Sequence, residues 1–120
     1  MLIRNRVKFD GKYAVPARIL LGMQGDNLSE RVVFTLPQVE AGQTVYAKWQ
    51  GKTENSDIIT CVAGETEGEY YWDVSATDTR VAQDMDVYVQ IVGADGVVWS
   101  SNVFTASVRD VPDVDSNIEQ

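Results

Sequence analysis

Carboxylates are the most abundant side chains that could do chemistry in this chain, which has 18 Asp and Glu residues. Two carboxylates facing each other across a cleft are the arrangement that hydrolyses glycosidic bonds. Asp73 lies at an outward position of a predicted strand, and Asp84 and Asp86 flank the start of the next one. No spacing places two of them across a cleft. Because Asp and Glu are mostly exposed in folded proteins, we interpret them as solvated charges.

The residue types give little support for a metal-binding site or for nucleophilic catalysis. Calcium prefers a dense run of oxygen ligands, whereas residues 84–86 and 113–115 each form only one Asp-x-Asp pair. The chain has no His and one Cys, which removes the commonest general base, the usual zinc nitrogen ligand and any thiolate cluster. Cys61 lies inside a predicted strand, where we expect an apolar filler. We therefore expect a protein that is not an enzyme, with no catalytic, cofactor-binding or metal-binding residues.

The aromatic residues allow two interpretations. Ring faces stack on the CH groups of sugars, so Tyr46 and Tyr71, at outward positions of their strands, could line a glycan-binding face together with Trp99. Alternatively, Trp49 and Trp72 are core residues, as is usual in a β-sandwich, and exposed tyrosines on strands need no ligand.

Charge is distributed unevenly along the chain. Residues 1–18 carry five basic residues and one acidic residue, a net charge of +4, so a total of −8 leaves −12 for the rest. Arg4, Arg6 and Lys8 lie on one face of their predicted strand, with Ile3, Val7 and Phe9 on the other. They fit either a solvated edge strand, whose charges prevent aggregation, or an arm that docks on the acidic body of a neighbouring copy. Nucleic acid would be repelled by most of this surface, so we expect no nucleic-acid partner.

The elements that must position these side chains are short strands. Apolar residues alternate with polar ones almost throughout the 120 residues, and turn residues recur about every 8–12 positions. The predicted strands cover residues 2–9, 15–21, 31–36, 44–50, 56–63, 69–74, 86–92 and 97–108. Whether Ile58 or Ile59 points inward is ambiguous, and residues 75–84 are the only plausible helical turn. The fold class is all-β, an immunoglobulin-like antiparallel β-sandwich of about seven to eight strands with at most one short helical turn.

The domain organisation predicted from these patterns has three parts. Residues 1–21 form a basic arm or first strands joined to the sandwich, and residues 22–109 form the sandwich itself. Residues 110–120 are an acidic flexible tail or linker. No stretch approaches the roughly 20 apolar residues that span a bilayer, so we expect no membrane insertion. Arg4 and Arg6 lie where a secretory signal peptide would need its apolar core, so we expect no such leader.

Several motifs resemble a known family. Residues 25–37, Gly-Asp-Asn-Leu-Ser-Glu-Arg-Val-Val-Phe-Thr-Leu-Pro, are similar to the opening of the immunoglobulin-like N-terminal domain of phage baseplate upper proteins. In that family a Gly-Asp-Asn turn precedes a strand of the form Phe-x-Leu-Pro. Residues 46–49 match the aromatic strand that follows, residues 94–98 the Asp-Gly hairpin, and residues 104–108 the last strand. The resemblance covers about residues 22–108.

The resemblance implies a structural protein rather than an enzyme. It would be a module of a phage or prophage tail tip or baseplate, made in the bacterial cytoplasm and assembled into the virion. Its partners would be other tail proteins and copies of itself, with Arg4, Arg6, Lys8, Tyr46, Tyr71 and Trp99 as candidate interaction residues. The alternative is a carbohydrate-binding or adhesin domain of a bacterial surface protein, with a cell-surface glycan as its ligand.

Overall fold

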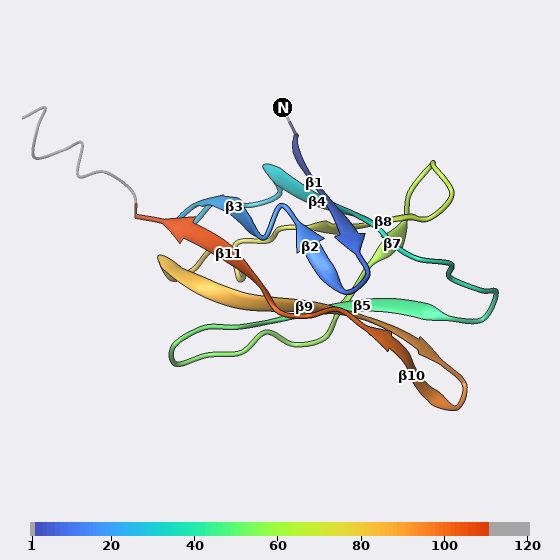
Figure 1. The fold of residues 1–120 in the computed structure, drawn as a ribbon. Helices are drawn as coiled ribbons and strands as arrows, with labels where there is room; N and C mark the ends of the chain where they lie inside the picture. Colours follow the sequence, from blue (N-terminus) through green and yellow to red (C-terminus); the bar gives the residue numbers. More distant parts are fainter. Residues whose placement is uncertain (1, 111–120) are drawn as a thin grey trace, which may run out of the picture.

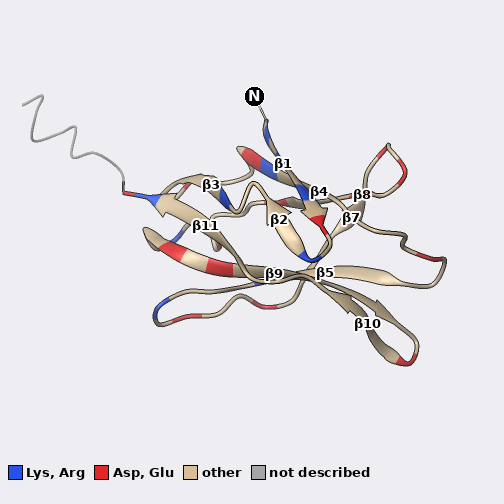
Figure 2. Cartoon of the chain, viewed as in Figure 1, with Lys and Arg blue, Asp and Glu red and all other residues tan. Residues whose placement is uncertain are grey.

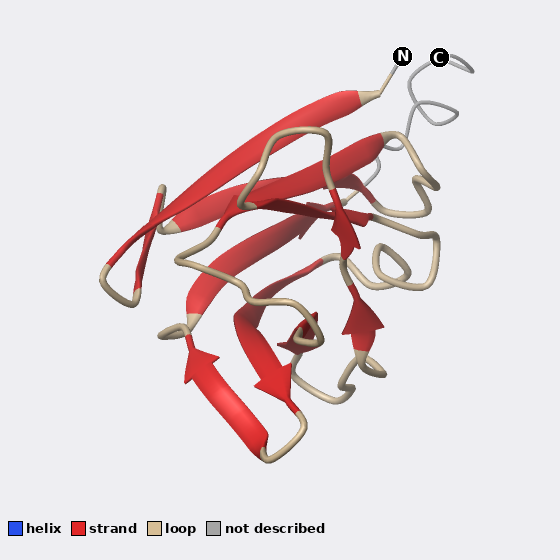
Figure 3. Ribbon diagram, turned by 90° about the vertical axis from the view of Figure 1, so that its right-hand side faces the viewer, coloured by secondary structure: helices blue, strands red, loops and turns tan. Residues whose placement is uncertain are grey.

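Eleven strands make up the fold in the computed structural model, which describes residues 2–110. Figure 1 follows them along the chain, and Figure 3 shows them from the side as two layers. In chain order they are β1 (Ile3–Asp10), β2 (Tyr13–Val15), β3 (Arg18–Met23), β4 (Glu30–Thr35), β5 (Thr44–Gln50), β6 (Ile59–Thr60), β7 (Val62–Ala63), β8 (Glu69–Asp73), β9 (Gln83–Gly93), β10 (Gly96–Ser100) and β11 (Phe104–Arg109). The predicted all-β sandwich is confirmed.

The strands form two sheets. Sheet A has the order β2-β1-β4-β8-β7, and sheet B has the order β3-β11-β9-β5-β6, with β10 also paired to β9. Most neighbours are antiparallel, as predicted, but β1 pairs with β4 and β3 pairs with β11 in parallel. The alternation of apolar residues fixes which face a strand buries and carries no information on its direction. The prediction of a purely antiparallel sandwich is therefore corrected at these two pairs.

Two predicted strands are each divided in two, and a short extra strand precedes a third. At Pro16 and at Cys61 the chain crosses between the sheets, whereas β10 and β11 both pair with β9 in sheet B. Pro16, which has no N–H to continue a ladder, separates β2 in sheet A from β3 in sheet B. Cys61 separates β6, which pairs with β5, from β7, which pairs with β8. The chain from β10 to β11 is held at Ser101, whose N–H donates to Val89 O and whose Oγ accepts from Val89 N. These breaks raise the count from the predicted seven or eight strands to eleven.

The connection before β9 is a turn. Asp78 N donates to Ser75 O at 3.0 Å, and Thr79 N donates to the same oxygen at 3.3 Å. The predicted helical turn is present only as this hydrogen-bonded turn, and its last residues belong to β9. No helix in the described part of the chain is long and apolar enough to cross a membrane.

The core lies between the two sheets. Trp72, Phe34, Leu21, Met85 and Ile91 are its largest fully buried side chains. Trp49 is also buried, which confirms that both tryptophans at the centre of the chain are core residues. The ambiguous position is settled as well, since Ile59 packs against the core and Ile58 is 60% exposed.

Candidate docking surface

The outer side of sheet A collects the basic residues of β1 in register with β4 and β8. Because alternate residues of a strand point to opposite faces, the burial of Val7, Phe34 and Trp72 turns their neighbours outward. The pairing then aligns three rows across the sheet: Arg4, Arg31 and Asp73; Arg6, Val33 and Tyr71; and Lys8, Thr35 and Glu69. We call the surface formed by Arg4, Arg6, Lys8, Arg31 and Tyr71 the cationic face.

Arg31 is the cation of this face whose orientation is fixed by its neighbours. Its Nε donates to Asp73 Oδ1 at 2.6 Å and its Nη2 donates to Asp73 Oδ2 at 3.2 Å, a two-point contact that orients the guanidinium. The guanidinium carbon also lies 3.9 Å from the centre of the Tyr71 ring. The bond to Asp73 is the main reason that the pKa of Arg31 is raised further above its ordinary value. Arg31 is therefore a permanent cation held in one orientation.

Arg4 and Lys8 of this face remain available to a partner. Arg6 Nη1 lies 3.1 Å from Glu69 Oε2, and that ion pair leaves the Arg6 side chain 59% exposed. None of the four ion pairs that the structure describes between residues 2 and 110 involves Arg4 or Lys8. Arg4, Arg6 and Arg31 also line a cavity of about 430 Å³ with Tyr71, Glu69 and residues 63–66, which include Glu65. The face therefore offers cations and one ring to an acidic surface.

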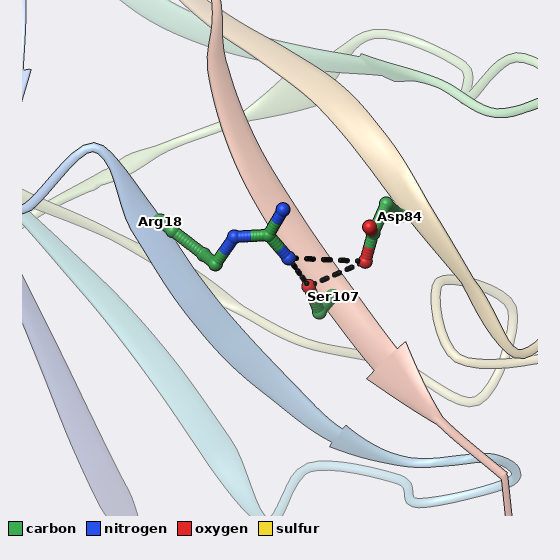
Figure 4. Close-up of polar contacts among 3 residues, drawn as sticks. All are labelled: Arg18, Asp84 and Ser107. Atoms are coloured by element: carbon green, nitrogen blue, oxygen red, sulfur yellow. Dashed lines mark hydrogen bonds and ion pairs between the residues drawn. The ribbon is translucent and has the colours of Figure 1, made fainter.

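The outer side of sheet B has no such excess of positive charge. Figure 2 shows acidic residues along β9 of sheet B, whereas the residues along β1 of sheet A are mainly basic. Arg18 on β3 donates to Asp84 Oδ1 at 3.3 Å and to Ser107 Oγ at 3.0 Å, while the Ser107 hydroxyl donates to Asp84 at 2.7 Å (Figure 4). The bond from Ser107, followed by Arg18, lowers the pKa of Asp84. Arg18 and Asp84 therefore satisfy each other within one copy.

The Gly-Asp-Asn turn, which supports the family resemblance, ties one end of the sandwich together. Asp26 Oδ2 accepts from Met23 N at 2.9 Å, and Asn27 Oδ1 accepts from Ala76 N at 2.9 Å. Gln24 N donates to Arg109 O at 2.8 Å, so the same turn also holds the end of β11. The turn therefore has a structural role that explains its residue types.

The solved N-terminal domain of phage TP901-1 ORF48 has the same fold. It superposes with a TM-score of 0.69 over 90% of this chain and 99% of that domain, at 13% sequence identity. No family model matches the sequence, and no curated protein sequence matches it. The likeness is one of structure, and it extends over nearly the whole of both chains.

The predicted interaction residues do not gather in one place. Arg4, Arg6, Lys8 and Tyr71 share the cationic face, and Arg31 joins them although sequence reasoning did not select it. Tyr46 lies on β5, in the other sheet. Trp99 packs against the core, with its ring 5.3 Å from that of Phe9 in an edge-on contact. The three aromatic residues considered for sugar binding therefore form no continuous strip.

Sequence reasoning missed Asp78, which accepts more hydrogen bonds than any other side chain among residues 2–110. It is buried and accepts hydrogen bonds from Trp49 Nε1 at 2.8 Å, Trp72 Nε1 at 3.1 Å, Ser75 N at 2.9 Å and Ser75 Oγ at 3.1 Å. Trp49 belongs to sheet B and Trp72 to sheet A, so the carboxylate links the two sheets. The sequence signals were the spacing Ser75-x-x-Asp78 in a turn and two core indoles that each need an acceptor, but neither signal brings the three side chains together. Four donors occupy the oxygens of Asp78, so its role is structural.

The other candidate reactive groups are dispersed. Within residues 2–110 no three His, Cys, Asp or Glu side chains lie together as a metal-binding group. Asp73 is engaged by Arg31, and Asp84 by Ser107. Burial raises the pKa of the Cys61 thiol to about 12, so it stays protonated at neutral pH. The pair at Asp113 and Asp115 lies outside the described residues.

Proposed function

We propose that this chain is a non-enzymatic structural module of a phage or prophage tail tip or baseplate, which docks on other tail proteins through the cationic face. The observation that carries the proposal is the shared fold with a phage protein domain over 90% of this chain. The motif resemblance to baseplate upper proteins supports the same assignment independently of the superposition. Its location would be the virion, after synthesis in the bacterial cytoplasm.

The cationic face supports the docking part of the proposal. A strip that carries four cations and only two paired acids, on a chain with a net charge of −8, selects partners by charge. The expected partner surface is acidic, with a side chain that fits against Tyr71. The same chemistry makes the contact sensitive to salt, because mobile ions screen exposed charges beyond about 8–10 Å at physiological ionic strength.

The test is binding to the tail proteins encoded beside this chain. Purified full-length chain is mixed with each protein, and binding is measured by calorimetry at low and high salt. Reversing the two cations that lack ion pairs, Arg4→Glu with Lys8→Glu, should weaken binding on the order of tenfold or more. The matched control, Lys12→Glu with Lys52→Glu, makes the same charge change at exposed positions away from the face and should bind normally.

Two results would contradict the proposal. One is that no neighbouring tail protein binds, while the chain binds a cell-surface glycan in a manner abolished by Trp99→Ala or Tyr71→Ala. The other is that the control pair weakens binding as much as the pair on the cationic face, which would reduce the effect to overall charge.

A further inference from the structure

The edge of β1 is open over most of its length. β4 pairs with β1 from Ile3 to Lys8, whereas β2 pairs with its other edge only from Lys8 to Asp10. β2 ends at Val15 because Pro16 cannot donate to a ladder and leads the chain to sheet B. Within the described residues, the edge from Ile3 to Val7 therefore has no partner strand.

The backbone groups on that edge belong to Arg4 and Arg6. The Ile3 N–H donates to Ser29 O at 2.9 Å, on the β4 side. Successive residues of a strand direct their backbone groups to opposite edges, so Arg4 and Arg6 direct theirs to the open side. Lys8, which follows in the same alternation, is the residue that pairs with Val15 of β2. Two N–H and two C=O groups are thus ready to bond an added strand.

The side chains beside this edge specify what could occupy it. Arg4, Arg6 and Lys8 point to the outer side at every second position. On the inner side, Ile3 is 52% exposed and Val7 is buried. The side chain of Asn5 donates to Leu20 O at 3.0 Å, which bridges to β3 without occupying the plane of sheet A. A matching strand needs acids at alternate positions on one side and apolar residues on the other.

One segment of this chain has that pattern. Residues 113–119 read Asp-Val-Asp-Ser-Asn-Ile-Glu, and they lie outside the described residues. Their odd positions, Asp113, Asp115 and Glu119, would fall on one side of an extended strand with Asn117. Their even positions place Val114 and Ile118 on the other side.

We propose that residues 113–119 of one copy add as a strand to the open edge of β1 in a second copy. In register with the two open residues, Asp113 and Asp115 of the donor would lie beside Arg4 and Arg6, and Val114 would fall on the same inner side as Ile3. A second copy is favoured because β11 ends beside β3 in sheet B and points away from the start of β1 (Figure 1). To reach the edge within one copy, the chain would have to reverse its direction and change sheets.

This contact makes each copy both donor and acceptor. Such a head-to-tail contact closes into a ring, or continues as a chain, depending on the rotation between copies. It goes beyond the proposed function, because it concerns contacts between copies and does not depend on any other tail protein. Main-chain hydrogen bonds would supply affinity, and the alternation of charge would set the register.

The experiment measures the mass of the full-length chain by light scattering over a range of concentrations at low salt. We expect a mass above that of one copy, which rises with concentration. Neutralising the donor with Asp113→Asn, Asp115→Asn and Glu119→Gln should raise the dissociation constant on the order of tenfold, as should Arg4→Glu with Arg6→Glu. Combining Arg4→Glu and Arg6→Glu with Asp113→Lys, Asp115→Lys and Glu119→Lys should restore association. Lys12→Glu with Lys52→Glu is the matched control and should leave the mass unchanged.

Amide hydrogen exchange locates the contact. In the associated protein the amides of Arg4 and Arg6 should exchange roughly tenfold or more slowly than in the neutralised donor variant, and their protection should increase with concentration. A single copy at all concentrations would overturn the proposal, and so would association that survives neutralisation of the donor. Protection of these amides that does not change with concentration would also overturn it, because the segment would then bind its own copy. The neutralised donor variant keeps the cationic face, so it should still bind other tail proteins, which separates failure here from failure of the proposed function.

Discussion

Removing the Asp78 carboxylate should destabilise the protein more than any other single change at a polar side chain. Asp78→Ala deletes the acceptor of two indole N–H groups, and both rings are buried, with 4% exposure for Trp49 and 2% for Trp72. The variant therefore leaves two buried donors without partners, one from each sheet.

The size of the effect follows from those two donors. Each buried donor that loses its partner costs about 1–3 kcal/mol. Two of them lower the free energy of unfolding by about 2–6 kcal/mol, a large share of the roughly 5–15 kcal/mol that stabilises a typical domain. At this chain length the midpoint of thermal unfolding falls by about 4 °C per kcal/mol. Asp78→Asn keeps one oxygen acceptor and should lose about half as much.

Urea unfolding followed by tryptophan fluorescence is the appropriate measurement. The midpoint should fall while the slope with urea stays the same, because the surface exposed on unfolding is unchanged. Asp57→Ala is the matched control: Asp57 lines the same end of the sandwich but is exposed, and it should unfold like the parent chain. A loss below about 0.5 kcal/mol for Asp78→Ala, which is the range of ordinary surface substitutions, would refute the view that this carboxylate joins the sheets.

Three further predictions concern single residues. Glu30 is buried with Oε2 unpartnered, and burial, followed by the charge of Asp26, raises its pKa. The contribution of Glu30 to stability is therefore full below its unfolded pKa and is lost as pH rises through its folded pKa. Glu30→Gln should stabilise the fold at pH 7 by on the order of 1 kcal/mol, and this advantage should disappear in titrations toward pH 4. Cys61, with its pKa raised to about 12, should resist alkylation at pH 8 in the native state and react at once in urea, and equal labelling rates in the two states would contradict its burial. Gly22 has φ of 127°, and an added Cβ would lie 2.8 Å from Asp26 Oδ2, so Gly22→Ala should cost about 1–3 kcal/mol in urea unfolding. Gly11→Ala, at φ of 61° with no atom within 4 Å of the added Cβ, should cost less.

The alternation of apolar residues was sufficient to predict the fold class and much of the core. Val7, Trp49 and Trp72 are buried because each occupies the inward position of a strand in which its neighbours are polar. The same pattern could not show that β1 and β4 are parallel, because alternation is symmetric with respect to chain direction. It also could not show where the chain crosses between sheets, since those breaks depend on which neighbour each strand finds.

The candidate site was predictable only where it lies on regular strands. Arg4, Arg6, Lys8 and Tyr71 follow from alternation, but their placement side by side depends on the register of β1, β4 and β8. Trp99 could not be placed in this way, because a register shift between Val97 and Trp99 interrupts the alternation of β10. Asp78 lies in a turn, where alternation does not apply, and its role appears only once Trp49 and Trp72 are brought together from different sheets.

The basic character of β1 has a consequence for how the sandwich avoids unwanted pairing. An open strand edge attracts any extended chain, and charged side chains along it are a common defence against aggregation. On this edge the two residues with unpaired backbone groups are also the two arginines, so an incoming strand must bring acids to be accepted. On the outer side of sheet B, by contrast, Arg18 is already paired with Asp84 and Ser107, so it does not select for an acidic partner in the same way. One charge pattern can therefore exclude most strands from the edge while admitting an acidic one, and this selectivity is what an assembly module requires of an edge that it leaves open.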